Sequence, residues 1–399
     1  MTVDRVIVVG AGPVGLTASM LLAEQDIPVL ILEADSVISD DLRASTFHSP
    51  TLDMLEPYGL TDELIAQGLI CPTWQIRMHA TGEKAVFDLS LISDATAHPY
   101  RLQCEQAKLC RLLADSFSDD DRIDIQYSTK VTGISQTDET VEVLTERADD
   151  GAEETLTARY VIGADGAGSV VRESLGLEFK GSTYPETTVL ASTTFPFQDY
   201  IEGLSNVSYC WSEGGNFALL RLKDFWRCSL YYDPDLTFEE ATSDERIQFQ
   251  LNDVLPNPEP YEIVDVRPYR VHQRIVDTYR VGRILLAGDA AHINSPSGGM
   301  GMNGGIHDAF SLAEKLSEIW RGGDDSLLDL YTRQRRLVAE SAILRQADLN
   351  RRRMAQKDPD ARARALADLQ ATTADPEKAR DYLLKSSMIA GLQMAASIK

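Results

Sequence analysis

Short runs of consecutive apolar residues recur along the chain and predict buried strands. They lie at residues 6–9, 28–32, 160–163 and 283–287. Runs without polar alternation are typical of parallel strands that are covered on both faces. A helix with apolar periodicity up to about Ala23 follows the first run, and a long helix over residues 304–320 follows the last. This β–turn–α–β order predicts the nucleotide-binding start of a doubly wound sheet.

A second set of segments is rich in β-forming residues and predicts a different, antiparallel sheet. Val207, Tyr209 and Trp211 share one strand face there by strict alternation. A turn at Thr81-Gly82-Glu83 joins the first two segments. The segments are residues 74–80, 84–90, 217–222 and 225–232, and the whole region 181–270 is mostly of this type.

The two kinds of segment interleave, so the chain is expected to leave its first domain and return to it twice. The expected dinucleotide-binding domain comprises residues 1–73, 100–178 and 272–345, and the second-sheet domain comprises 74–99 and 179–271. Residues 346–399 are expected to form C-terminal helices. Helical patterns also cover residues 49–59, 61–68, 105–117 and the region from 327 onward, and short β runs fill 123–158.

Charge and cysteine content exclude several classes of partner. The chain has 38 Lys and Arg against 62 Asp and Glu, a net charge of −24. Such a surface repels phosphate backbones and anionic headgroups, so we expect neither nucleic acid nor a membrane as partner. No apolar run approaches the roughly 20 residues of a membrane span. Five cysteines without metal-binding spacing predict free thiols in the cytoplasm and no metal site.

Two further expectations concern the surface and the assembly. The run Arg351, Arg352, Arg353 is expected to be a solvated helix face rather than a binding patch. We expect a monomer or a homodimer, in which the C-terminal helices could serve the association.

The first chemical motif is GxGxxG, placed between the first predicted strand and its helix. Gly10 permits a tight turn, Gly12 lets the backbone approach a pyrophosphate, and Gly15 allows close helix–strand packing. Glu33 follows about twenty residues on, where a carboxylate can accept ribose hydroxyls. The motif predicts a dinucleotide site, but it does not distinguish NAD from FAD.

Two further glycine-containing segments follow predicted strands. Asp165 and Gly166 lie in ADGAGSVVR, where the carboxylate can accept backbone and hydroxyl donors and tighten a turn. Gly288 and Asp289 precede SPSGGMGMNGG, which exposes backbone at close range before a helix. The N–H groups at the start of that helix can stabilise negative charge on a reduced cofactor.

In their order and wording, these three segments resemble the fingerprints of the group A flavin-dependent monooxygenases, the family of para-hydroxybenzoate hydroxylase. The resemblance implies an α/β plus β architecture: a glutathione-reductase-like Rossmann domain with bound, non-covalent FAD, an inserted antiparallel β-sheet domain for the substrate, and a helical C-terminus. Apart from residues 299–304 within the third segment itself, the chain has no second GxGxxG, so NADH or NADPH would bind only transiently. It also lacks WxWxIP, which argues against a flavin-dependent halogenase.

The resemblance also assigns cofactor contacts. Arg43 matches the arginine that contacts the FAD phosphates. Gln106 matches a glutamine that reaches the flavin side chain, with Gln103 as a competitor. Asp289 matches the aspartate that binds a ribityl hydroxyl, and Pro296 would lie beside the flavin ring. The full expected set is Gly10, Gly12, Pro13, Gly15, Glu33, Ala34, Arg43, Gln106, Val131, Asp165, Gly166, Gly288, Asp289, Pro296, Gly299, Gly301, Met302 and Asn303, the last two at the pyrimidine edge of the ring.

The reaction that the resemblance implies is hydroxylation by a single-component enzyme. NAD(P)H would reduce FAD, O₂ would add to form a flavin hydroperoxide, and one oxygen would pass to an electron-rich ring. A phenol-like or N-heteroaromatic substrate is expected, because an electrophilic oxygen needs an activated carbon. The alternatives are an FAD-dependent reductase or oxidase of the same fold, and a flavin-binding regulatory protein.

The residues expected to take part in catalysis are fewer than those expected to contact the cofactor. Tyr209 and Trp211, with Arg221 nearby, are expected to form the floor under the substrate ring, although each aromatic could be ordinary core. His48 is included because it lies next to a helix start, where a capping or packing role is favoured over a catalytic one. Pro296, beside the flavin ring, completes the set.

Overall fold

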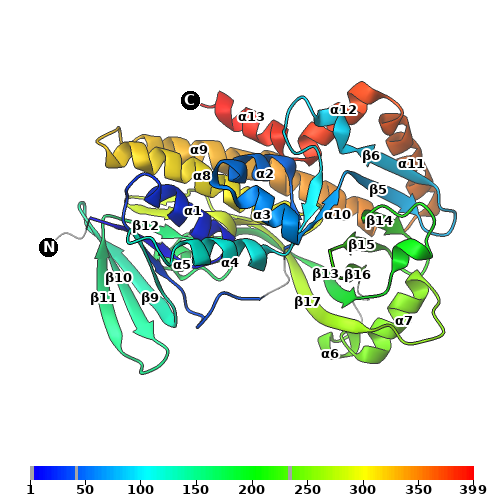
Figure 1. Cartoon of the computed structure of the whole chain (residues 1–399), viewed down its shortest axis with the longest axis horizontal. Coiled ribbons are helices and arrows are strands. Elements are labelled where there is room, and N and C mark those ends of the chain that lie inside the picture. Colours follow the sequence, from blue (N-terminus) through cyan, green and yellow to red (C-terminus); the bar gives the residue numbers. More distant parts are fainter. Residues whose placement is uncertain (1–3, 41–43, 232–235) are drawn as a thin grey trace.

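Two large β-sheets, each accompanied by helices, dominate the molecule (Figure 1). The computed structural model describes residues 4–40, 44–231 and 236–399. The first sheet has six strands in the order β18-β19-β12-β1-β2-β8. All are parallel except β18, which is antiparallel to β19. The strands are β1 (Val6–Val9), β2 (Val29–Leu32), β8 (Ile123–Gln126), β12 (Tyr160–Gly163), β18 (Arg280–Val281) and β19 (Ile284–Leu286), so each predicted apolar run is a strand of this sheet.

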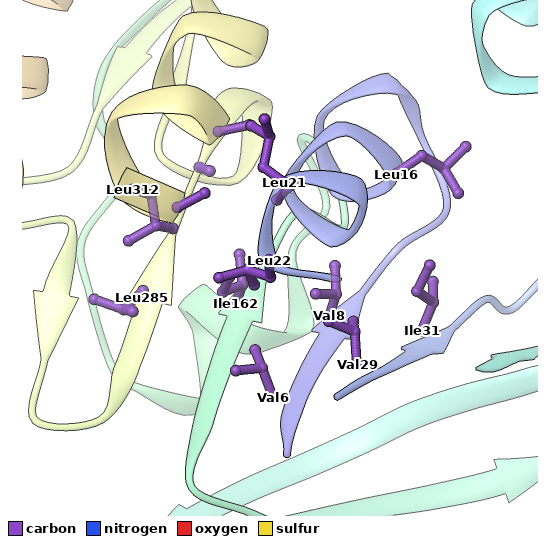
Figure 2. Close-up of a cluster of buried hydrophobic side chains, with 14 of the residues drawn as sticks. Val6, Val8, Leu16, Leu21, Leu22, Val29, Ile31, Ile162, Leu285 and Leu312 are labelled. Atoms are coloured by element: carbon purple, nitrogen blue, oxygen red, sulfur yellow. The ribbon is translucent and has the colours of Figure 1, made fainter. Parts of the chain in front are cut away.

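Helices α1 (Pro13–Ala23) and α8 (Gly301–Trp320) pack against each other over this sheet, and α4 (Gln106–Ser116) packs against α1. Figure 2 shows the apolar side chains that β1, β2, β12 and β19 direct toward α1 and α8. Full burial of each such side chain stabilises the fold by roughly 1.5–3 kcal/mol. This core fixes the ends of the strands, after which the three glycine-containing segments begin.

The second sheet has eight strands in the order β20-β17-β13-β16-β15-β14-β5-β6. Its pairs are antiparallel, as predicted, except that β14 runs parallel to β5. The antiparallel prediction is wrong at that pair, because β5 comes from a distant part of the chain rather than from a hairpin partner. The strands are β5 (Thr73–Met78), β6 (Lys84–Asp88), β13 (Lys180–Thr193), β14 (Val207–Trp211), β15 (Phe217–Arg221), β16 (Trp226–Tyr231), β17 (Ile263–Ile275) and β20 (His292–Ile293).

Two helices interrupt the region predicted as mostly β. They are α6 (Phe238–Ala241) and α7 (Asp244–Val254). Thr237 caps α6 through a capping box with Glu240, and Ser243 caps α7 by accepting from the N–H of Arg246. These capping residues are a local signal for the helices.

Smaller elements complete the first half of the chain. Two three-stranded sheets have the orders β11-β10-β9 and β3-β7-β4. Their strands are β3 (Thr46–Phe47), β4 (Leu69–Cys71), β7 (Arg101–Gln103), β9 (Thr129–Gln136), β10 (Val141–Arg147) and β11 (Glu153–Ala158). The helices are α2 (Ser49–Leu55), α3 (Leu60–Gln67) and α5 (Val170–Ser174).

The C-terminal helices cover the outer part of the second sheet (Figure 1). Leu366, Leu369 and Leu383 share a buried cluster with Trp74 and Trp211 of that sheet. The helical C-terminus is therefore part of the core of the second sheet. Its elements are α9 (Leu327–Val338), a π-helical turn (Ala339–Leu344), α10 (Arg345–Ala355), α11 (Pro359–Thr373), α12 (Pro376–Ser386) and α13 (Ile389–Ser397).

A buried ion pair joins the end of β19 to α8 and α9. Asp308 of α8 and Arg335 of α9 are almost completely buried, with Arg335 Nε donating to Asp308 Oδ1 over 2.6 Å. The other carboxylate oxygen accepts the Gly288 N–H (3.1 Å) and lies 2.8 Å from His292 Nε2. Burial raises the pKa of Asp308, but Arg335 and His292 outweigh burial and hold it at about 2. The carboxylate is thus charged and engaged through both of its oxygens.

Asp308→Asn should lower the free energy of unfolding by about 3–5 kcal/mol, because it leaves the Arg335 cation buried without its counter-ion. The folded-state pKa of about 2 lies below the roughly 3.9 of an unfolded aspartate, so this stabilisation is present above about pH 4 and is lost as the pH falls toward 2. Chemical denaturation at pH 7 measures the change. Asp329→Asn, which removes an exposed partner of Arg280, is the matched control and should have little effect. Equal effects of the two substitutions would contradict the prediction.

Candidate active site

One cavity of about 1130 Å³ lies between the carboxyl ends of the parallel strands and the face of the second sheet. This exceeds the roughly 300–1,000 Å³ of a single small-molecule site. It is lined by most of the residues predicted to contact the cofactor, although they come from distant parts of the chain. These are Gly10, Gly12, Pro13, Glu33, Ala34, Gln106, Val131, Asp165, Gly166, Asp289, Pro296, Gly299, Gly301 and Met302. Arg43 lies outside the described residues.

The glycines of the first turn have separate structural reasons. Gly10 has φ +101°, and a Cβ there would lie 2.6 Å from the Ala164 carbonyl oxygen. A Cβ at Gly15 would clash with the Gly10 carbonyl, so Gly15 serves packing and does not line the cavity. A Cβ at Gly12 would meet only open space, so the backbone at Gly12 faces the cavity directly. This is the surface on which a pyrophosphate can lie close to backbone N–H groups.

Glu33 stabilises the glycine turn through hydrogen bonds and also lines the cavity. Its Oε2 accepts the Ala11 N–H over 2.7 Å, and its Oε1 accepts the Asp35 N–H over 2.9 Å. Each carboxylate oxygen keeps a second lone pair for a ligand hydroxyl. The acid at the end of β2 therefore organises the glycine turn in addition to its predicted role.

Asp165 is held within its own turn. Ser169 Oγ donates to its Oδ1 (2.5 Å), and the Val171 N–H donates to its Oδ2 (3.1 Å), which fixes the start of α5. Burial raises the pKa of Asp165, and these hydrogen bonds act in the opposite direction. The buried Arg172 connects this turn to the third segment, since its guanidinium donates to the carbonyls of Ala167 and Ala290. The second and third fingerprints are thus joined.

The third segment is built on close backbone contacts. Gly288 has φ +61°, and a Cβ there would lie 2.9 Å from Val14 of α1. A Cβ at Gly305 would lie 2.5 Å from the same valine side chain, so the end of β19, α1 and α8 meet at van der Waals distance.

Gly288 lies behind the cavity wall, whereas Asp289 lines the cavity. The first turn of α8 begins at the cavity with Gly301 and Met302, and Met300 provides no side-chain cap.

Asn303 supports the loop from behind, rather than facing the cavity as predicted. It is fully buried, and its Oδ1 accepts the His48 N–H and the Thr51 hydroxyl. Its Nδ2 donates to the carbonyls of Thr46 and Gly299, both at 2.7 Å. All four hydrogen-bonding positions of the amide are therefore used to hold residues 46–51 against the glycine loop.

His48 also supports the loop. Its Nε2 lies 2.8 Å from the Gly298 carbonyl oxygen, it is fully buried, and it is not among the residues that line the cavity. Burial, together with the nearby Arg101, lowers the pKa of His48 to about 3, so the ring is neutral at pH 7. This placement matches the packing role favoured for His48.

The second sheet supplies the opposite wall of the cavity. Leu190, Ser229, Ala218 and Tyr209 form one row across four neighbouring strands, and all line the cavity. The row combines apolar side chains with two hydroxyl groups, which suits a flat aromatic ring with polar substituents.

Of the other residues predicted for the ring's floor, Trp211 and Arg221 are not in this wall. Trp211 is buried, and its Nε1 donates to the Arg353 carbonyl (2.9 Å), because α10 covers that end of β14. The sheet arginines that line the cavity are the buried Arg227 of β16 and the exposed Arg267 and Arg270 of β17, all of which the sequence analysis missed. The sequence signal that could have identified Arg227 is an arginine within a mostly apolar predicted strand.

Helix α10 contributes to the wall as well. Arg351 and Ala355 line the cavity, and Asn350 Nδ2 donates to the Ser297 carbonyl (3.3 Å). The Arg351 guanidinium lies 3.9 Å from the centre of the Tyr184 ring and donates hydrogen bonds to Asp348.

Only Arg352 of the run Arg351, Arg352, Arg353 fits the predicted solvated face, with a side chain 71% exposed. The prediction is wrong for Arg351, because α10 turns toward the cavity.

Comparison with known proteins identifies the family. The FAD binding domain family matches residues 4–346. The chain belongs to this family. A 6-hydroxy-3-succinoylpyridine 3-monooxygenase of Pseudomonas putida is 34% identical over 358 residues, which cover 89% of this chain and 90% of that protein. A para-nitrophenol 4-monooxygenase of a Pseudomonas species is 32% identical over 395 residues, which cover 98% of this chain and 97% of that protein. The crystal structure of p-nitrophenol 4-monooxygenase from Pseudomonas putida matches with a TM-score of 0.90 and 32% identity over 96% of this chain and 97% of that one.

These matches confirm the cofactor and the reaction type that the sequence predicted. The protein is an FAD-dependent aromatic monooxygenase that uses NAD(P)H and O₂. The cavity fits FAD on three counts: open space at Gly12, an uncapped helix start at Gly301, and a volume that leaves room for a second ligand. The mixed α/β fold with a helical C-terminus is that of aromatic hydroxylases.

Asp289→Ala should weaken FAD binding more than Asp165→Ala. Asp289 is the expected ribityl ligand, and its loss would strand a hydroxyl donor at a cost of about 1–3 kcal/mol. Asp165 is engaged by Ser169 and Val171, so its loss should act more on the reduction by NAD(P)H. The FAD dissociation constant and the anaerobic reduction rate of each variant measure this. If Asp165→Ala loses FAD while Asp289→Ala keeps it and fails only in reduction, the two roles are reversed.

Proposed function

We propose that the protein hydroxylates a phenol or a hydroxylated N-heteroaromatic ring that lies on the row formed by Leu190, Ser229, Ala218 and Tyr209. The observation that carries this proposal is the single cavity that joins the three glycine-containing segments to that row. A ring on the second sheet and FAD on the glycine segments would share one cavity. That arrangement favours transfer between them.

The two relatives narrow the proposed substrate. Their names place a ring hydroxyl opposite the oxygenated carbon: position 4 of para-nitrophenol, and position 3 of a 6-hydroxypyridine. In both, the oxygenated carbon carries a further substituent, nitro or succinoyl. We therefore propose a six-membered aromatic substrate with a hydroxyl group and a substituent opposite to it, oxygenated at the substituted carbon.

Bound FAD supplies the activation of O₂ with electrons from NAD(P)H. The chain's own residues bind, orient and enclose. In our proposal the backbone at Gly12 receives the pyrophosphate, Asp289 a ribityl hydroxyl, and Pro296 and Gly299 lie beside the flavin ring. The start of α8 at Gly301 offers N–H groups to developing negative charge.

Finer features of the architecture are proposals too. The parallel strands β12, β1 and β2, with the glycine turn after β1, support a glutathione-reductase-like Rossmann domain. The division into residues 1–73, 100–178 and 272–345, against 74–99 and 179–271, is supported by the membership of most strands. Strand β20 departs from it, since it pairs with β17 of the second sheet.

The cysteines bear on the compartment in which the protein works. All five cysteines are free and buried, which supports the expected reducing cytoplasm. We propose a monomer or a homodimer. Within the described part of the chain, no helix has both the length and the apolar character to cross a membrane.

A panel of phenols and hydroxypyridines tests the proposed function. With FAD-loaded protein, para-substituted members should stimulate NAD(P)H oxidation and give products oxygenated opposite the hydroxyl, as judged by mass spectrometry. Ring analogues without the hydroxyl, such as nitrobenzene, are the controls and should not be oxygenated. NAD(P)H oxidation at an equal rate with and without every ligand, with no oxygenated product, would favour the reductase or oxidase alternative.

A further inference from the structure

One cation occupies an unusual place in the wall of the cavity. Arg227 lies within β16, its side chain is 3% exposed, and it lines the cavity. Its Nη1 donates to Ser45 Oγ over 2.9 Å. An arginine keeps its charge at any accessible pH, so this wall carries a permanent positive charge.

Arg227 has one apolar and one polar neighbour on the sheet. Leu220 is its cross-strand partner on β15 and lines the cavity, and Ser192 is its partner on β13. The charged groups of β17 that line the same cavity are Asp265, Arg267 and Arg270. Leu190 and Ala218 belong to the adjacent row on the same wall. With little water around it, a charge acts strongly on a ligand that lies on this wall.

Arg227 also lies close to the glycine loop of the third segment. Ser45, which accepts its hydrogen bond, precedes Thr46. A Cβ at Gly299 would lie 2.8 Å from the Thr46 side chain, and the Thr46 carbonyl accepts from Asn303. The cation therefore lies where the substrate wall meets the loop that carries Pro296 and Gly299.

We propose that Arg227 binds the ionised hydroxyl group of the substrate and thereby selects phenolates over neutral rings. This inference rests on the proposed function, because it concerns the ring on the second sheet. The O–H bond of the phenol breaks, the proton passes to the bulk buffer, and the remaining oxygen anion pairs with the guanidinium. The anion makes the ring richer in electrons, which is what an electrophilic oxygen requires.

The test uses 4-nitrophenol as a probe, since its phenolate absorbs visible light and reports ionisation without turnover. Difference spectra of FAD-loaded protein, recorded across pH without NAD(P)H, give the pKa of the bound ligand. In the wild type this pKa should lie about 1–3 below that of the free ligand. Arg227→Gln should abolish the lowering and weaken phenolate binding at least tenfold, and Arg227→Lys, which keeps the charge, should restore much of both.

Arg221→Gln provides the comparison variant, since Arg221 is a half-buried arginine on the neighbouring strand and outside the cavity wall. It should leave the pKa of the bound ligand lowered. If Arg221→Gln removes the lowering, or if folded, FAD-loaded Arg227→Gln keeps it, the proposal is overturned.

A second measurement covers the case in which the Arg227 variants do not fold. Wild-type protein is titrated with 4-nitrophenol and with its methyl ether, which cannot ionise. The preference for the phenol should rise with pH to at least tenfold, and equal affinities across the range would overturn the proposal. These failures leave the oxygenation of phenols intact, whereas failure of the proposed function shows as no oxygenated product from any phenol or hydroxypyridine.

Discussion

The site depends on one buried contact, the carboxylate of Asp308 against the guanidinium of Arg335. Neither group touches the cavity, yet Asp308 also accepts the Gly288 N–H at the end of β19. Arg335 Nη2 in turn donates to the Gly304 carbonyl in the first turns of α8. The ion pair thereby fixes the strand end and the helix start, between which the residues from Asp289 to Met300 must span. Because breaking such a pair leaves a buried charge without its counter-ion, displacing either element from the other is strongly unfavourable.

Around that anchor, the cavity is assembled from walls of different character. One wall is backbone, exposed at Gly12 and at the glycine loop, and suits the phosphates and edges of a cofactor. The other is the face of a sheet, apolar with isolated polar groups, and suits a ring. Asn303 and His48 stand behind the first wall and keep it in place through neutral hydrogen bonds. Because the backbone wall suits the cofactor and the sheet face suits the ring, the chain uses two sheets for one reaction.

Local patterns in the sequence predicted the first sheet well. The apolar runs before Gly10, Asp165 and Gly288 are strands, because burial on both faces demands such runs and the glycine turns require their ends. The same logic failed where tertiary context decided the outcome. Trp211 shares a strand face with Tyr209, yet α10 covers one and leaves the other at the cavity. The parallel pairing of β5 with β14 and the inward direction of Asn303 depend on contacts between distant segments, which alternation cannot reveal.

The contribution of α10 to the cavity wall has a consequence for the order of events during synthesis. The glycine turn after β1 is among the first parts of the chain to be made, and Arg351 and Ala355 are among the later ones. Helices α11 and α12, which share the buried cluster of Trp74 and Trp211, follow later still. A ribosome-bound chain that has produced every glycine-containing segment still has an open cavity and an uncovered second sheet. The wall of the cavity is therefore completed only after α10 has been made, well after the last glycine-containing segment.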